Sequence, residues 1–245
     1  SAEDFMGLTY PLLSKGKLGD SQMAWFKQNL LDPYARAQEN LSADRLQLME
    51  DFKTLKKALD VPKDLRKKTD SGFTKEQAIR VYLFNKAGFD VPGISKTDLN
   101  ELLDLVNSDG VLKAFGDQIF NITKGDGYAK PGENWLVGTI TTDLIDVLNT
   151  VKRAKYLEQS GYTANAELIF SKENLNKLEA EYGAKYREAL ENVLGRMKSG
   201  KNRIFSGNRL SNRVLDYINN STGAIMFFNT RSAVLQTISS INFLN

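Results

Sequence analysis

The stretch Asp32–Leu59, with the sequence DPYARAQENLSADRLQLMEDFKTLKKAL, decides the fold. Its large apolar residues recur at intervals of three, four and seven positions, which places them on one face of a helix. These residues are Leu41, Leu48, Phe52, Leu55 and Leu59. Asp32-Pro33 at the start is typical of an N-cap followed by a proline in the first turn. We therefore predict one long helix from Asp32, which Val61-Pro62 ends.

The same periodicity continues on both sides of this stretch, and no alternating apolar and polar run indicates a β-hairpin. Further helices are predicted over 21–31, 74–88, 95–106, 112–122, 142–161, 171–199, 209–219 and 224–243. Thr74 and Gln77 have the spacing of a capping box, which favours a helix start at Thr74. All five prolines precede residue 132, so the later helices contain none of these helix breakers. The chain is predicted to be an all-α, multi-helix bundle of about eight to ten helices.

The loop Gly125–Gly132, with the sequence GDGYAKPG, is the clearest break in the helical pattern. We predict that residues 125–132 link two sub-bundles. The N-terminal one covers residues 1–124, and the C-terminal one covers 133–245 and includes the long helix over 171–199. Trp135 follows this loop, and we expect its side chain to fill the junction between the two sub-bundles.

The composition excludes several kinds of catalysis. The 245 residues are 41% hydrophobic and 26% charged, as in a globular protein, and they include no histidine and no cysteine. The chain alone therefore cannot build a Ser-His-Asp or Cys-His relay, a Cys/His zinc site or a disulfide. A carboxylate metal site or a carboxylate acid/base pair stays open, and we expect no cofactor, no bound metal and no catalytic residues.

Three carboxylate pairs and one glycine motif are candidates for chemistry. The pairs are Glu101 with Asp104, Asp143 with Asp146, and Glu179 with Glu181, and all occur on amphipathic helices. We interpret all three as solvated helix faces. Gly195–Lys201 has the spacing of a phosphate-binding loop, but Asn202 replaces the final Ser or Thr. Because Gly200 is expected to end a helix rather than to precede one, this motif is interpreted as structural.

The net charge of +3 is unevenly distributed. Residues 192–245 contain seven Lys or Arg and a single acid, Asp216. The candidate phosphate-binding residues in this part are Arg196, Lys198, Lys201, Arg203, Arg209 and Arg213. Such a segment would bind a nucleic-acid backbone in a salt-sensitive manner and without sequence preference. The alternative interpretation is a basic loop that simply stays solvated.

The segment Gly223–Leu244 is the longest apolar-rich stretch, but its polar residues make it too polar for an ordinary transmembrane helix. We expect its large side chains to pack against a partner, and the candidates are Phe227, Phe228, Leu235, Ile238 and Ile241. The N-terminus shows no signal peptide. The chain begins at Ser1 and stops within this apolar-rich stretch, which we interpret as the ends of a fragment cut from a longer protein.

Three segments carry a family resemblance. They are Tyr186–Arg203 (YREALENVLGRMKSGKNR), Gly223–Phe243 (GAIMFFNTRSAVLQTISSINF) and Thr74–Leu103. They resemble parts of very large, multi-domain (polyvalent) proteins of tailed bacteriophages and prophages. The resemblance implies a protein carried in the virion or delivered by it, and a non-catalytic helical part of that protein. It implies no catalytic residue.

Our first hypothesis is therefore a non-enzymatic structural or interaction module of a large, virion-associated phage protein, which is either carried in the virion or ejected from it with the DNA. Its expected partners are other segments of the parent protein, other virion proteins, or further copies in an oligomer. Its expected location is the virion, or the host cytoplasm after delivery. One alternative is a sequence-independent nucleic-acid-binding module that uses residues 196–213. Another is an envelope- or membrane-penetrating helical module.

Overall fold

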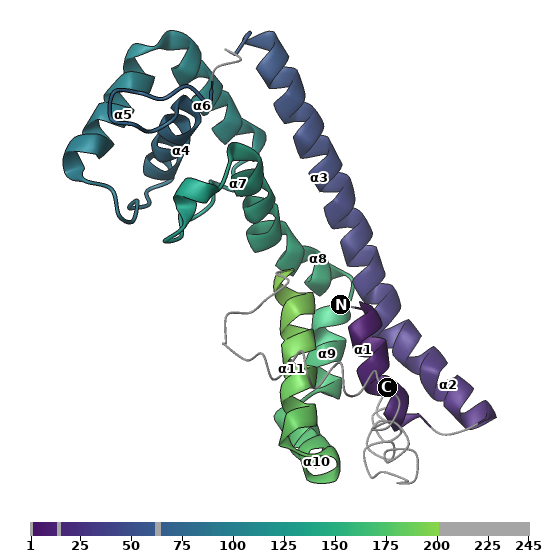
Figure 1. The fold of residues 1–245 in the computed structure, drawn as a ribbon. Helices are drawn as coiled ribbons and strands as arrows, with labels where there is room; N and C mark the ends of the chain where they lie inside the picture. The colour runs from purple at the N-terminus through teal and green to yellow at the C-terminus, as the bar shows by residue number, and fades with distance from the viewer. Residues whose placement is uncertain (1, 14–15, 62–64, 201–245) are drawn as a thin grey trace. The chain divides into compact units, whose positions relative to one another are not determined.

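The structure is a computed structural model that describes residues 2–13, 16–61 and 65–200 (Figure 1). In these ranges the regular elements are all helical, which confirms the predicted all-α, multi-helix bundle. Eleven α-helices form nine continuous helices there, because π turns join α2 to α3 and α7 to α8. The helices predicted over 209–219 and 224–243 lie outside the described residues.

Two compact units make up the chain, and the second is inserted into the first along the sequence. Of the described residues, unit 1 takes in those up to Glu39 and those from Arg153 to Gly200, and unit 2 takes in those within Asn40–Lys152. The sequence-based boundary at 125–132 is not the boundary between these units. That loop lies inside unit 2, and its residues Tyr128 and Ala129 are buried.

Unit 1 is built around one apolar core to which each of its helices contributes. Its elements are α1 (Ala2–Thr9), α2 (Lys17–Phe26), the start of α3, α8 (Arg153–Gln159), α9 (Tyr162–Ile169), α10 (Lys172–Tyr182) and α11 (Ala184–Ser199). Helix α11 packs on both α1 and α10, and α8 packs on α9 and α11. The Tyr186 hydroxyl ties α11 to α1 by donating to the Leu8 carbonyl oxygen at 2.7 Å. Ala189, Val193 and Met197 lie on one face of α11 and are fully buried in this core.

The long helix α3 (Asp32–Ala58) covers nearly the predicted range, but it continues a preceding helix and does not begin as a new one at Asp32. A π turn, Lys27–Leu31, joins it to α2, so Asp32 is not an N-cap and has helical backbone angles. Pro33 has no N–H, and it therefore leaves the carbonyl oxygen of Asn29 without its usual helical donor. The side chain of Asn165 in α9 donates to that oxygen at 2.8 Å. A tertiary contact thus allows Pro33 to lie inside a continuous helix.

The single long helix predicted over 171–199 is wrong, because two helices cover these residues. Gly183 lies between α10 and α11 with φ 93° and ψ 165°, a conformation that is favourable only for glycine. Ser171 caps α10 as the sequence indicates, by accepting from the N–H of Asn174. Gly200 ends α11 in the left-handed conformation, as predicted.

Unit 2 is centred on α4 (Lys75–Lys86), whose buried residues lie on most of its circumference. It packs against α5 (Lys96–Ser108) and α6 (Gly110–Ile122), and α7 (Ile140–Val147) with the π turn Leu148–Lys152 completes the unit. The predicted capping box of Thr74 and Gln77 is present, and Ser95, where a helix is predicted to begin, caps α5. Asp109 separates α5 from α6 by accepting from the first N–H groups of α6. These caps fix where the helices of unit 2 begin.

Candidate interaction site

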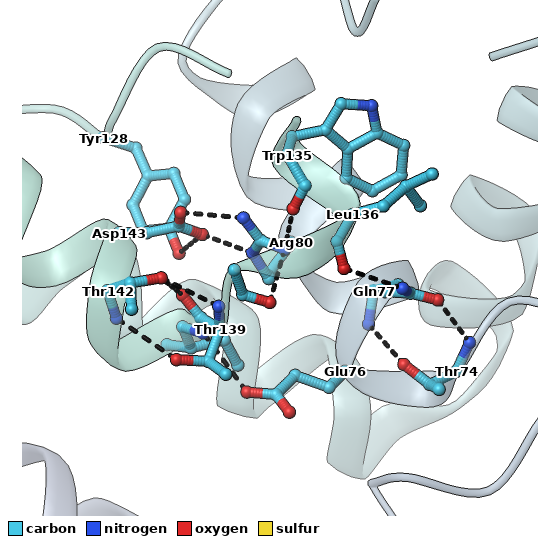
Figure 2. A network of polar contacts seen from close by, with 12 residues as sticks. Thr74, Glu76, Gln77, Arg80, Tyr128, Trp135, Leu136, Thr139, Thr142 and Asp143 are labelled. Carbon is cyan, nitrogen blue, oxygen red and sulfur yellow. Dashed lines mark hydrogen bonds and ion pairs between the residues drawn. The ribbon is translucent and has the colours of Figure 1, made fainter. Parts of the chain in front are cut away.

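The best-defined polar site of unit 2 forms around Arg80, in the middle of α4. Its side chain is 2% exposed, although it is charged. The guanidinium forms a two-pronged ion pair with Asp143 of α7, from Nε to Oδ2 at 2.6 Å and from Nη2 to Oδ1 at 2.9 Å (Figure 2). Nη1 donates to the carbonyl oxygens of Trp135 and Gly138, the latter at 2.8 Å. Because burying a charge costs much free energy unless hydrogen bonds or a counter-ion compensate for it, this set of acceptors is what permits Arg80 here.

The start of α7 places Asp143 opposite Arg80. Thr139 and Thr142 form a capping box, and the N–H of Ile140 donates to the carboxylate of Glu76 at 3.2 Å. Asp143 follows one turn later, at a position flanked by the buried Ile140, Leu144 and Val147. Sequence position alone therefore puts this acid on the apolar face of α7.

Aromatic rings enclose the ion pair. The Tyr128 hydroxyl donates to Asp143 Oδ2 at 2.8 Å, and the Arg80 guanidinium lies over the rings of Phe84 and Trp135, at 5.4 and 5.9 Å from their centroids. Burial first, and then the negative charge of Asp143, raise the pKa of Tyr128 well above its ordinary value. The hydroxyl therefore stays protonated and remains a donor over the physiological pH range.

The network fixes a short 3₁₀ turn, Trp135–Val137, at the surface (Figure 2). Gln77 donates to the Leu136 carbonyl oxygen at 3.2 Å, and the Trp135 indole donates to the Pro92 carbonyl oxygen at 2.8 Å. Trp135 is buried, but the two residues that follow it are not: Leu136 is 48% exposed and Val137 is 86% exposed. We call these two residues the apolar tip. The buried network thus fixes the backbone of the turn that carries these two exposed apolar side chains.

We expected the Trp135 side chain to fill a junction between two sub-bundles, and the structure does not place it there. It lies within unit 2, where its ring stacks on Phe73 and meets Phe84 edge-on, each at 6.2 Å between centroids. The prediction of a buried Trp135 is confirmed, and its expected position is corrected.

Unit 1 has a second buried arginine, Arg153, which is 5% exposed. Nε donates to the carbonyl oxygen of Met197 at 3.2 Å, and Nη2 donates to the Tyr34 hydroxyl at 3.3 Å. The side-chain oxygen of Gln38, in the amide orientation that satisfies both groups, accepts from Nη1 at 2.8 Å and from Nη2 at 3.0 Å. Within the described part of the chain no carboxylate pairs with Arg153. Its acceptors are neutral, and one of them is a carbonyl at the C-terminal end of α11, where the helix dipole favours a cation.

The carboxylate pairs have different environments. Asp143 is 5% exposed and ion-paired, so its interpretation as a solvated residue is wrong. Glu179 pairs with Arg187 at 2.7 Å, while Glu101, Asp104, Asp146 and Glu181 are exposed as predicted. Within residues 2–13, 16–61 and 65–200, no group of three acidic residues could hold a metal ion.

The predicted phosphate-binding residues are only partly covered by the structure. Arg196 and Lys198 lie in the last turn of α11. Arg196 is partly buried and pairs with Asp4 of α1 at 3.2 Å, and Lys198 is exposed. Lys201, Arg203, Arg209 and Arg213 lie outside the described residues, as do Phe227, Phe228, Leu235, Ile238 and Ile241. The ion pair gives Arg196 a structural role at the contact between α1 and α11.

Comparison of the chain with protein-family models, with curated proteins and with solved structures gives no match. Among the described helices, none combines the length and the apolar character that a membrane crossing needs. The site therefore has to be interpreted from its own chemistry.

Proposed function

We propose that the chain is a non-enzymatic interaction module of a large, virion-associated phage protein. We further propose that the apolar tip, Leu136 and Val137, is a point of contact with another protein of the particle. The observation that supports this is the rigid display of the tip: both neighbouring carbonyl oxygens are held by Arg80, and the carbonyl of Leu136 itself is held by Gln77.

A turn whose backbone is already fixed loses less conformational entropy when a partner binds. An exposed valine contributes little to folding, because burial of apolar surface is the stabilising step. In a complex, however, it contributes more when its backbone is already fixed, since immobilising a loop on binding costs free energy. The turn at Leu136 and Val137 meets this condition, and its exposed apolar side chains are those that a partner pocket would bury.

The family resemblance and the site involve the same helix. Thr74–Leu103, which resembles segments of the large phage proteins, contains α4 and therefore contains Gln77 and Arg80, the residues that hold the turn. The resemblance supports the proposed virion setting, and the fixed turn supports the proposed contact point.

The experiment replaces the tip in the phage that encodes the protein and measures its copy number in purified particles by quantitative mass spectrometry. L136S/V137S is expected to lower incorporation by about tenfold, the loss typical of removing an apolar anchor. The melting temperature should not change, because both side chains are exposed in the free protein. The matched control is L46S/V111S, which removes two other exposed apolar side chains of unit 2. Absence of the wild-type protein from particles would overturn the proposed setting, and equal incorporation of both variants would overturn the proposed contact.

A further inference from the structure

Unit 2 also has a strongly basic region, and it is distinct from the basic segment 196–213. Six exposed cations lie at the end of α3 and in the loop before α4: Lys53, Lys56, Lys57, Arg66, Lys67 and Lys68. We call them the cationic surface. In the described part of the chain none of the six has a carboxylate within ion-pair distance, and Asp60 is the one described acid between them.

Unit 2 as a whole is not basic. Residues 40–152 contain 16 Lys or Arg and 17 Asp or Glu, so this unit carries a formal net charge of −1. Residues 53–68 contain seven of these cations and only two of these acids. The positive charge of unit 2 is therefore concentrated on one short part of its sequence, and the remainder of the unit is acidic.

Fold stability accounts for two of these six cations. Lys56 and Lys57 lie in the last turn of α3, where the negative end of the helix dipole favours cations, and Lys56 also lies over the Phe52 ring at 5.6 Å. The helix dipole does not explain Arg66, Lys67 and Lys68 in this way, because they lie near the N-terminal end of α4 and not at the C-terminal end of a helix. The Leu65 and Lys67 carbonyl oxygens accept from the N–H groups of Glu76 and Lys75, which fixes the loop against the N-terminal turn of α4.

That position is electrostatically unfavourable for a cation, because the N-terminal end of a helix carries partial positive charge. The one acid in the first turn, Glu76, accepts from the N–H of Ile140 in α7. The helix end itself is not a free anion site, since the loop carbonyls and the Thr74 hydroxyl occupy its N–H groups. Three exposed cations fixed beside a positive helix end thus raise the local potential without stabilising the fold, which is the arrangement expected where an external polyanion binds.

We propose that the cationic surface binds the phosphate backbone of a nucleic acid, without sequence preference. Five of its six cations are lysines, which contact phosphates as point charges and read no base pattern. An anionic membrane fits less well, because peripheral membrane binding also needs large apolar side chains at the surface. Among the described residues between positions 47 and 110, no large apolar side chain is exposed.

The test uses the full chain and a fluorescein-labelled DNA duplex, with binding followed by anisotropy over a series of salt concentrations. Two triple variants remove the two halves of the surface, K53Q/K56Q/K57Q and R66Q/K67Q/K68Q. Each is expected to weaken binding by about tenfold at moderate salt and to lower the slope of log K against log salt by about two to three. K96Q/K124Q/K130Q is the matched control, since it removes three exposed lysines elsewhere in unit 2 and should change neither quantity.

Three results would overturn the proposal. Equal weakening by the control triple would show that only net charge matters. Loss of binding in R203Q/R209Q/R213Q, with both surface triples unaffected, would locate the site in the C-terminal basic segment. Equally tight binding of polyglutamate or of anionic vesicles to the cationic surface would identify a different partner class. None of these results bears on the apolar tip, so this inference and the proposed function can fail separately.

Discussion

The two units solve the same physical problem, a buried arginine, in different ways. In unit 2, Arg80 is neutralised by the carboxylate of Asp143, which it meets with two hydrogen bonds. In unit 1, Arg153 is buried almost as fully, but its acceptors are a carbonyl oxygen, a tyrosine hydroxyl and a glutamine amide. Each guanidinium also lies against a glycine: a Cβ on Gly138 would come within 2.8 Å of Arg80, and one on Gly200 within 2.8 Å of Arg153.

Arg80 is stabilised by a counter-ion, whereas Arg153 is stabilised only by the dipoles of neutral groups. Removing the anion of a buried pair leaves an uncompensated charge, and this is far more costly than removing a neutral hydrogen-bond partner. Removing the arginine of a dipole-bound site takes the charge away with it. The units should therefore respond unequally to mutation. Each unit contains one of the two tryptophans, Trp25 in unit 1 and Trp135 in unit 2, so their unfolding can be followed separately by fluorescence in W135F and W25F backgrounds.

The largest effect is expected for Asp143→Asn, which keeps the shape of the side chain and removes its charge. Arg80 then stays buried without a counter-ion, and unit 2 should lose about 3–5 kcal/mol of unfolding free energy. Urea unfolding in the W25F background measures this loss through Trp135. The apolar double variant R80M/D143L, which removes both charges, should be less destabilised than D143N alone.

The control for this experiment is Asp104→Asn, at an exposed position of α5 in the same unit. It makes the same chemical change at the surface, where substitutions cost within about 0.5 kcal/mol. Equal losses for the two asparagine variants would mean that the Arg80–Asp143 pair does not stabilise unit 2, and the proposed rigidity of the apolar tip would fail with it.

A smaller effect is expected for Arg153→Met in unit 1. The variant removes the charge together with its hydrogen bonds and leaves the Met197 carbonyl, Tyr34 and Gln38 short of a donor. The expected cost is about 1–3 kcal/mol, measured by urea unfolding in the W135F background. Arg36→Met is the matched control, because Arg36 is an exposed arginine of the same unit. A loss as large as that of D143N would contradict the distinction between the two sites.

Short sequence patterns predict where most helices begin and end, but they do not predict contacts between residues that are far apart in the sequence. The caps and stops at Thr74, Ser95, Ser171 and Gly200 are confirmed, because a cap depends on a few neighbouring residues. The break at Gly183 is not predicted, since an isolated glycine within a helical pattern gives no direct sign of its backbone angles. The interpretation of Pro33 as a helix start is wrong for a different reason: the Asn165 amide that satisfies the freed carbonyl of Asn29 is far away in sequence.

The candidate site could have been found only in part. Asp143 lies on the same helix face as Ile140, Leu144 and Val147, and an acid within an apolar stripe indicates a buried partner. That pattern predicts that a cation exists, but it does not identify Arg80, which is 63 residues away. The exposure of Leu136 and Val137 has no sequence signal, because it depends on contacts from α4 that fix the turn.

The smallest expected effect is a change in the pH dependence of the unfolding free energy, which can be measured for each unit. Burial, as the largest cause, raises the pKa of two tyrosines in each unit: Tyr82 and Tyr128 in unit 2, and Tyr162 and Tyr186 in unit 1. For Tyr82 the hydrogen bond to Asp117 adds to this, and the pKa rises from 10.0 to about 12. A phenol whose pKa is raised by folding contributes stability that is complete below the unfolded pKa and is lost as the pH rises toward the folded pKa.

The unfolding free energy of both units should therefore fall with increasing pH between about 10 and 12, because the unfolded chain releases its tyrosine protons first. Y82F/Y128F should flatten this slope for unit 2, and Y162F/Y186F should flatten it for unit 1. Urea unfolding at stepped pH values, followed through Trp135 or Trp25, measures each slope. The slope is the right quantity, since phenylalanine also removes hydrogen bonds and lowers stability at every pH. If one pair of substitutions flattened the slope of both units, the two would unfold as one cooperative body, and the unequal costs predicted for D143N and R153M could not be measured separately.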